Sequence, residues 1–172
     1  MRSASRLAIH GGVPRIRKKF RRYNSMGPEE IRAATRVVRS GVLSQFLGAW
    51  DPDFYGGPRV REFEKACCRA FRVDHAITVN SWTAGLTAAV GAIGLEPGDE
   101  VIVPTWTMCA SATAVLHWWG IPVFADIDPL TFCLDPRSVE KNLTSRTRAI
   151  LAVDIFGQSC DMDALRKIAD RR

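Results

Sequence analysis

The sequence lacks the patterns that mark several common classes of protein. No apolar run approaches the roughly 20 residues of a membrane-spanning helix, and the apolar patch at residues 7–9 is too short for a signal peptide. The five cysteines include no C-x-x-C pair, so the usual zinc and redox signatures are missing. These absences favour a cytoplasmic protein with reduced thiols and no membrane partner.

Other motifs for ligands are also missing. The turn after a strand expected at residues 76–79 is poor in glycine and fits neither G-x-G-x-x-G nor the P-loop pattern. The three histidines share no ligand spacing. Asp126, Asp128 and Asp135 lie among prolines that indicate turns and helix starts. We therefore expect no metal ion.

The positive charge is unevenly distributed. Residues 1–39 contain 11 Lys and Arg against two Glu, whereas the remainder of the 172 residues is net negative. The basic cluster at residues 15–23 is of a kind that can contact nucleic acid or a membrane surface, but no zinc-finger, recognition-helix or base-stacking motif accompanies it. We favour a solvated arm, or a contact with an acidic or phosphorylated ligand, and expect no nucleic-acid partner.

Strand-like and helix-like segments alternate after an irregular arm at residues 1–25. Hydrophobic periodicity and the positions of Pro, Gly and Asp predict helices at 27–40, 58–71, 83–94, 107–118, 135 onward and 161–170. The same signals predict strands at 76–79, 100–104, 122–126 and 149–153. This order predicts an α/β domain with a mostly parallel sheet flanked by helices.

The segment 75–108 carries the strongest functional signal. It is expected to form a strand, a turn, a helix and a second strand, with Ser81 and Thr83 at the helix start. Unpaired N–H groups and the positive end of the helix dipole suit a phosphate there. Alternatively, Ser81 or Thr83 simply caps the helix. The residues alone leave both interpretations open.

Two further groups of residues follow predicted strands. Ligands bind at the carboxyl ends of parallel strands, where Trp106 or Met108 is placed to lie on an aromatic cofactor ring. Composition alone favours core packing for both side chains. Asp154 and Gln158 follow a later strand and are placed to face the same cleft.

The ordered motifs together resemble one family. They are Gly11-Gly12-Val13-Pro14, Ser40-Gly41-Val42-Leu43-Ser44, Gly57-Pro58, Asn80 to Leu86, Pro97 to Met108 and Asp154 to Asp163. This order resembles the DegT/DnrJ/EryC1/StrS family of pyridoxal-phosphate-dependent sugar aminotransferases and covers nearly the whole chain. The resemblance implies the large domain of the aspartate-aminotransferase-like fold (fold type I), with pyridoxal 5'-phosphate as cofactor.

The resemblance also assigns roles to particular residues. The family's phosphate-binding turn matches Ser81, Trp82 and Thr83, with Trp82 in place of the usual Gly. Its P-x-x-T-aromatic-x-A-S/T motif places Met108 where an aromatic residue covers the cofactor ring, and includes Ala110.

Two assignments are less direct. Trp106 is a reserve candidate for the ring-covering position. The family often has His where Asp154 stands, so Asp154 and Gln158 are substrate candidates only.

No catalytic residue is assigned within the chain. The resemblance places the Schiff-base Lys, and the Asp that pairs with the pyridinium nitrogen, after the region of Ala169, and the chain's own lysines stand in other contexts. We therefore interpret residues 26–172 as the N-terminal part of the cofactor-binding large domain, without its remainder or the small C-terminal domain. This piece is expected to be inactive by itself.

The resemblance implies a complete enzyme that transfers an amino group from Glu or Gln to a nucleotide-linked keto sugar, for polysaccharide or sugar-antibiotic biosynthesis. It implies a homodimer in which the basic arm can reach the partner's substrate phosphates. The main alternative is a non-catalytic sensor or regulator that keeps the fold. A basic DNA-binding protein and a different sheet-based cofactor domain are the remaining alternatives.

Overall fold

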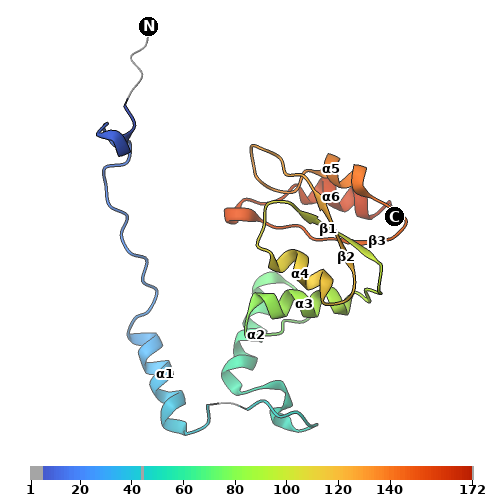
Figure 1. Ribbon diagram of the computed structural model, residues 1–172. Coiled ribbons are helices and arrows are strands. Elements are labelled where there is room, and N and C mark those ends of the chain that lie inside the picture. Colours follow the sequence, from blue (N-terminus) through green and yellow to red (C-terminus); the bar gives the residue numbers. More distant parts are fainter. Residues whose placement is uncertain (1–5, 44, 172) are drawn as a thin grey trace. The chain divides into compact units, whose positions relative to one another are not determined.

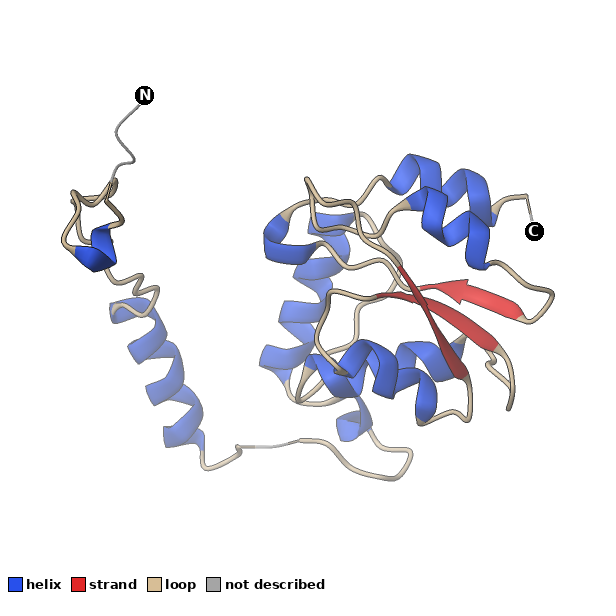
Figure 2. Cartoon of the chain, turned by 45° about the horizontal axis from the view of Figure 1, so that its top comes forward, coloured by secondary structure: helices blue, strands red, loops and turns tan. Residues whose placement is uncertain are grey.

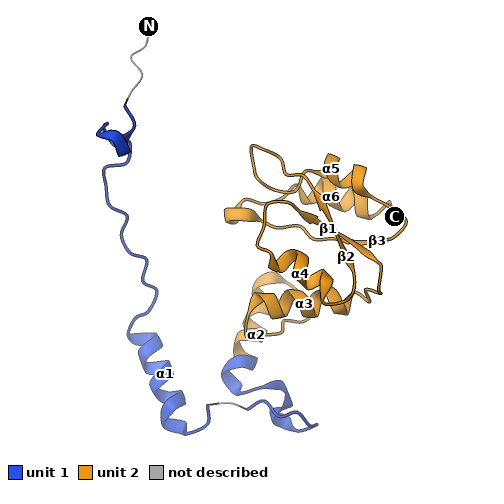
Figure 3. Ribbon diagram, viewed as in Figure 1, with its two compact units in different colours: residues 1–61 blue, residues 62–172 orange. Residues whose placement is uncertain are grey.

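The computed structural model describes residues 6–43 and 45–171 and contains two compact units, residues 1–61 and 62–172 (Figure 3). This division differs from the arm expected at residues 1–25 and the domain expected at 26–172, which stay predictions.

Most of unit 1 is irregular, and α1 is the one α-helix that lies wholly within its described residues. Its elements are η1 (Ala8–His10), α1 (Pro28–Ser40), η2 (Pro52–Tyr55) and the start of α2 (Pro58–Phe71), which continues into unit 2. The Glu30 carboxylate accepts the Gly27 N–H at 2.7 Å, and this hydrogen bond lowers the pKa of Glu30. The helix ends at Gly41, whose φ of +74° lies in the left-handed region. The helices predicted at 27–40 and 58–71 are confirmed.

Unit 2 is built on a three-stranded parallel sheet. Its strands are β1 (Glu100–Pro104), β2 (Ile121–Ala125) and β3 (Thr147–Ile150), in the order β2-β1-β3 (Figure 1). β1 pairs in parallel with both neighbours. The predicted parallel α/β architecture is confirmed, and β1 has its predicted bounds. β2 lies one residue earlier than predicted, and β3 begins two residues earlier and ends three residues earlier than the strand predicted at 149–153.

The side chains of β1 alternate between two hydrophobic cores, as successive residues of a strand must. Ile102 lies in the core with α5 (Pro136–Asn142) and α6 (Met162–Ala169). Val101 and Val103 lie in the other core, with α3 (Trp82–Ala92) and α4 (Ala110–Leu116). Helices thus cover both faces of the sheet (Figure 2).

The helices predicted at 83–94, 107–118, 135 onward and 161–170 are confirmed as α3, α4, α5 and α6. α3 begins one residue earlier than predicted and ends two earlier, and α4 and α6 are shorter at both ends. α4 begins three residues later than predicted, because residues 105–109 form a turn in which the Thr107 and Ser111 hydroxyls share a hydrogen bond of 2.8 Å. In the described part of the chain, no helix is both long enough and apolar enough to cross a membrane.

Close packing joins α3 to α4. The indole Nε1 of Trp118 donates to the Thr87 carbonyl at 2.7 Å. A Cβ at Gly91 would approach Cζ2 of Trp118 to 2.1 Å, so the ring lies against a helix surface that only glycine leaves open.

The strand predicted at residues 76–79 is wrong. The segment has no strand structure, and Ile77 is 83% exposed. The Thr78 N–H and hydroxyl both donate to Oε1 of Glu64, at 2.8 and 2.9 Å. β-branched side chains favour a strand only where a neighbouring strand accepts the backbone hydrogen bonds, and a side chain takes this role here.

A buried carboxylate stabilises the amino end of the sheet. Glu100 is 3% exposed and accepts hydrogen bonds from the Thr144 hydroxyl and the Arg146 guanidinium. The Thr144 bond is the main cause that lowers the pKa of Glu100, and Arg146 adds to it. A carboxylate with a lowered folded-state pKa stabilises the fold above its unfolded pKa and loses this effect as the pH falls through the folded value. Strong acid should therefore weaken this end of the sheet.

We predict that Ile102→Ala lowers the free energy of unfolding by about 2–5 kcal/mol, because it leaves a cavity at a fully buried position of the central strand. Ile77→Ala is the matched control, and its effect should stay within about 0.5 kcal/mol because Ile77 is exposed. Urea unfolding followed by circular dichroism measures both. Equal effects of the two substitutions would contradict the packing described.

Candidate functional site

The start of α3 presents backbone donors to solvent. The Ser81 hydroxyl accepts the Ala84 N–H at 3.2 Å, and the Ser81 carbonyl accepts the Gly85 N–H at 3.1 Å. The N–H groups of Trp82 and Thr83 have no hydrogen-bond partner among the described residues. The two interpretations of this turn are therefore compatible, since Ser81 caps the helix while two donors stay open to an anion.

The indole ring of Trp82 lies along the helix and not over these N–H groups. A Cβ at Gly85 would lie 3.0 Å from Cε3 of Trp82 and 3.0 Å from Cγ2 of Val79, so the indole lies beside Gly85, one turn along the helix. Trp82 is 74% exposed.

The carboxyl end of β1 leads into the second candidate segment. The bond between the Thr107 and Ser111 hydroxyls, together with a 3.0 Å bond from the Ser111 N–H to the Met108 carbonyl, fixes the turn. Ser111 is buried, whereas Met108 is 74% exposed. Ala110 is half-buried and is the first residue of α4.

Trp106 has an aromatic partner that the sequence did not reveal. Its ring centroid lies 5.8 Å from that of Phe132, at an interplanar angle of 54°. Phe132 has φ +61°, an uncommon conformation for a bulky residue. In the sequence, residues 124–136 carry carboxylates, prolines and the ends of two expected elements, but no pattern that predicts an aromatic contact. The positive φ gives no signal in sequence, because a Phe usually avoids it.

Asp154 and Gln158 belong to one loop after β3 and are both exposed. Oδ1 of Asp154 accepts the Cys160 N–H at 2.9 Å, and Nε2 of Gln158 donates to the Ser159 carbonyl at 3.2 Å. Both side chains thus make bonds within their own loop. Among the described residues, no hydrogen bond joins these two side chains to each other, to Ser81 or to Met108.

Two buried thiols support the same loop. Sγ of Cys133 donates to the Gln158 carbonyl and Sγ of Cys160 to the Val153 carbonyl, both at 3.2 Å. Burial, with Cys133 nearby, raises the pKa of Cys160 to about 11. A thiol with such a pKa is a poor nucleophile near neutral pH, which favours a structural role. In the described residues, no group of His, Cys, Asp and Glu is arranged to hold a metal ion.

Comparisons with known proteins point to one family. The sequence profile of the DegT/DnrJ/EryC1/StrS aminotransferase family matches residues 26–172. The chain is 42% identical over 144 residues to the spore coat polysaccharide biosynthesis protein SpsC of Bacillus subtilis, covering 84% of this chain and 34% of that protein.

Other similar proteins carry names of specific enzymes. L-glutamine:2-deoxy-scyllo-inosose aminotransferase of Streptomyces paromomycinus is 38% identical, over 96% of this chain and 38% of its own length. GDP-perosamine synthase of Caulobacter vibrioides is 46% identical, over 67% of this chain and 31% of its own length.

Solved structures share the fold. The crystal structure of NtdA from Bacillus subtilis with its bound cofactor PMP aligns with a TM-score of 0.73 at 34% identity, covering 82% of this chain and 30% of that one. The chain spans about a third of the length of the curated relatives described above.

We predict that Asp154→Ala exposes the Cys160 thiol to labelling by a maleimide, because the substitution removes the acceptor that holds the Cys160 N–H. The labelling rate of Cys160 should rise at least several-fold, as read by mass spectrometry. Asp154→Asn is the matched control and should label slowly, since its amide oxygen still accepts the bond. Equal rates in the two variants would show that this hydrogen bond does not hold the loop.

Proposed function

The chain belongs to the DegT/DnrJ/EryC1/StrS aminotransferase family, and on that premise we propose that it forms part of a pyridoxal-phosphate-dependent aminotransferase. The proposed reaction transfers an amino group from Glu or Gln to a nucleotide-linked keto sugar. The names of the relatives GDP-perosamine synthase and L-glutamine:2-deoxy-scyllo-inosose aminotransferase support the acceptor and the donor. The name of SpsC supports a place in polysaccharide biosynthesis.

The observation that carries the proposal is the open start of α3. The cofactor's phosphate would be held by the N–H groups of Trp82 and Thr83, with hydroxyl oxygens of Ser81 and Thr83 beside them. An 11-residue helix adds the positive end of its dipole. These features fit a phosphate without any requirement for a glycine-rich turn, because the contacts come from the backbone.

A ring-covering role falls first to Met108. Its side chain is exposed, and sulfur makes favourable contacts with aromatic rings. Trp106 is the reserve because its ring already packs against Phe132. Ala110, the first residue of α4, offers a small side chain next to this position. When bound, pyridoxal phosphate supplies the electron sink for amino transfer.

We expect the 172-residue chain to have no aminotransferase activity by itself. The reaction requires a lysine that binds the cofactor covalently. The chain's lysines lie in the basic arm or on helices, and none is among the residues assigned to the cofactor: Lys18, Lys19, Lys65, Lys141 and Lys167. The proposed lysine belongs to sequence that follows this segment in the full-length protein, which we propose to be a homodimer.

The first test concerns the phosphate contact and uses the protein extended to its full reading frame. Trp82→Pro should weaken binding of pyridoxal phosphate at least tenfold, because proline removes one N–H donor, which is worth about 1.5–3 kcal/mol to a charged group. Proline is tolerated at the first position of a helix, and Ser81 already has the extended conformation that precedes proline.

Trp82→Ala is the control, since it removes the ring and keeps the N–H; its affinity should stay within about threefold of the wild type. Fluorescence titration with the cofactor measures both. The extended wild-type protein should also show an absorption band of covalently bound cofactor that borohydride abolishes. A protein that binds the cofactor without this band would be the non-catalytic sensor or regulator.

The second test concerns the basic arm. Charge reversal of the basic residues between Arg15 and Arg22 in the full-length protein should weaken sugar-nucleotide binding and flatten its salt dependence, because attraction to phosphates is lost. Reversal of Lys141 and Lys167, which lie on α5 and α6, is the control and should leave affinity unchanged. Isothermal titration calorimetry at two salt concentrations gives the comparison. Unchanged affinity in the arm variant would end this part of the proposal.

A further inference from the structure

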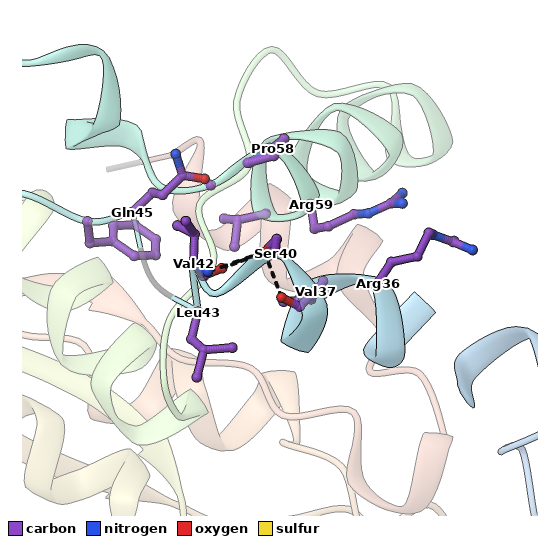
Figure 4. Close-up of a pocket in the computed structure, with 11 residues that line it drawn as sticks. Arg36, Val37, Ser40, Val42, Leu43, Gln45, Pro58 and Arg59 are labelled. Atoms are coloured by element: carbon purple, nitrogen blue, oxygen red, sulfur yellow. Dashed lines mark hydrogen bonds between the residues drawn. The ribbon is translucent and has the colours of Figure 1, made fainter. Parts of the chain in front are cut away.

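Unit 1 contains a cavity of about 480 Å³ that the cofactor assignment does not use. The last turns of α1, the following residues Val42, Leu43, Gln45 and Phe46, and the start of α2 form its walls (Figure 4). Ligand pockets in proteins typically occupy about 300–1,000 Å³ and combine an apolar lining with a few polar groups. This cavity has that size and that composition.

One wall of the cavity is apolar and open to water. Val42, Leu43 and Phe46 line it and are 51%, 74% and 56% exposed. Apolar side chains gathered on an exposed surface commonly mark a binding site. A flat ring would cover these side chains and exclude water from them.

The apolar wall is held in place by local contacts. The Ser40 hydroxyl donates to the Val37 carbonyl at 2.6 Å and accepts the Val42 N–H at 3.2 Å, which fixes the turn after α1 (Figure 4). Phe46 lies over Gly56, where a Cβ would come within 2.5 Å of its ring. The cavity is thus partly pre-formed.

The polar groups of the cavity are mainly cationic. Arg36 and Arg59 line it, and their side chains extend in the same direction (Figure 4). Arg36 forms no ion pair with an acidic side chain among the described residues; Arg59 also interacts within the protein. Guanidinium groups match phosphate oxygens in charge and in geometry.

Gln45 adds a group suited to a heterocycle. Its Nε2 donates to Oδ1 of Asp53 at 3.2 Å, and this bond orients the amide. The amide oxygen has no hydrogen-bond partner within the described residues and is available to accept an N–H.

We propose that this cavity binds the nucleoside diphosphate part of the substrate. The base lies against Val42, Leu43 and Phe46, and the diphosphate contacts Arg36 and Arg59. The two arginines of the lining select an anionic ligand, and the sequence of residues 1–39 carries an excess of positive charge as well. The inference rests on the proposed function, because it assigns the nucleotide of a nucleotide-linked sugar to particular residues.

The test measures binding of uridine, thymidine and guanosine diphosphates to the 172-residue chain by isothermal titration calorimetry. At least one should bind, and Arg36→Ala should weaken it tenfold or more, since a charge-assisted contact with phosphate is lost. Arg39→Ala is the matched control: it removes an arginine from the same helix that does not line the cavity, and affinity should change less than twofold.

A second pair of variants tests the base. Phe46→Ala should weaken the nucleotide at least fivefold and leave inorganic pyrophosphate unaffected. Trp50→Ala is its control, because Trp50 is an exposed aromatic residue of the same loop outside the lining. This pair keeps the proposal falsifiable if an arginine variant fails to fold, as circular dichroism would show.

Three results would overturn the proposal. Equal affinity for pyrophosphate and the nucleotides would show that the cavity is a bare anion site. Binding by none of the three nucleotides would exclude the ligand class. If sedimentation shows that Leu43→Asp separates copies of the chain while nucleotides do not bind, the cavity is an interface between chains.

The test also separates this inference from the proposed enzyme. Nucleotide binding by the 172-residue chain needs neither the cofactor nor amino transfer. A full-length protein without covalently bound cofactor, but with Arg36-dependent nucleotide binding, would refute the aminotransferase and keep the cavity. Covalently bound cofactor in a full-length protein whose nucleotide binding does not depend on Arg36 would support the aminotransferase and place its nucleotide site elsewhere.

Discussion

The burial of β1 on both faces is the constraint on which unit 2 depends. All five residues of the strand are buried, and both of its edges are paired with parallel neighbours. A strand in this position needs helices above and below it. The two cores follow, with Ile102 on one side and Val101 and Val103 on the other. The same constraint brings the chain out at Pro104, where residues 105–109 must turn before α4.

Backbone donors explain how a turn that lacks the usual glycines can hold a phosphate. An N–H group is present whatever side chain stands beside it, provided that the side chain turns away. Trp82 meets this condition because its ring lies beside Gly85. Binding by the main chain therefore tolerates a substitution that would abolish a site made of side chains. Motif searches based on glycine spacing alone overlook such a site.

Local signals were predictable from the sequence, and non-local partnerships were not. The bounds of β1 and the cap at Ser81 follow from neighbouring residues, and the Ser81 hydroxyl accepts a backbone N–H as expected. The segment 76–79 has the composition of a strand, but only a spatial neighbour makes it one. The contact of Trp106 with Phe132 and the bond of Asp154 to Cys160 join residues whose proximity depends on the folded loops.

In the proposed function, the start of α3 binds the cofactor phosphate through the backbone, so recognition of the acceptor falls to side chains elsewhere. The named relatives include GDP-perosamine synthase and L-glutamine:2-deoxy-scyllo-inosose aminotransferase, whose names specify different products and substrates. A turn that binds phosphate through backbone N–H groups reads no feature of the acceptor, so a shared fold is compatible with different substrates. Selectivity then requires a surface with its own shape and charge. The cavity in unit 1, with its apolar wall and two arginines, has both properties.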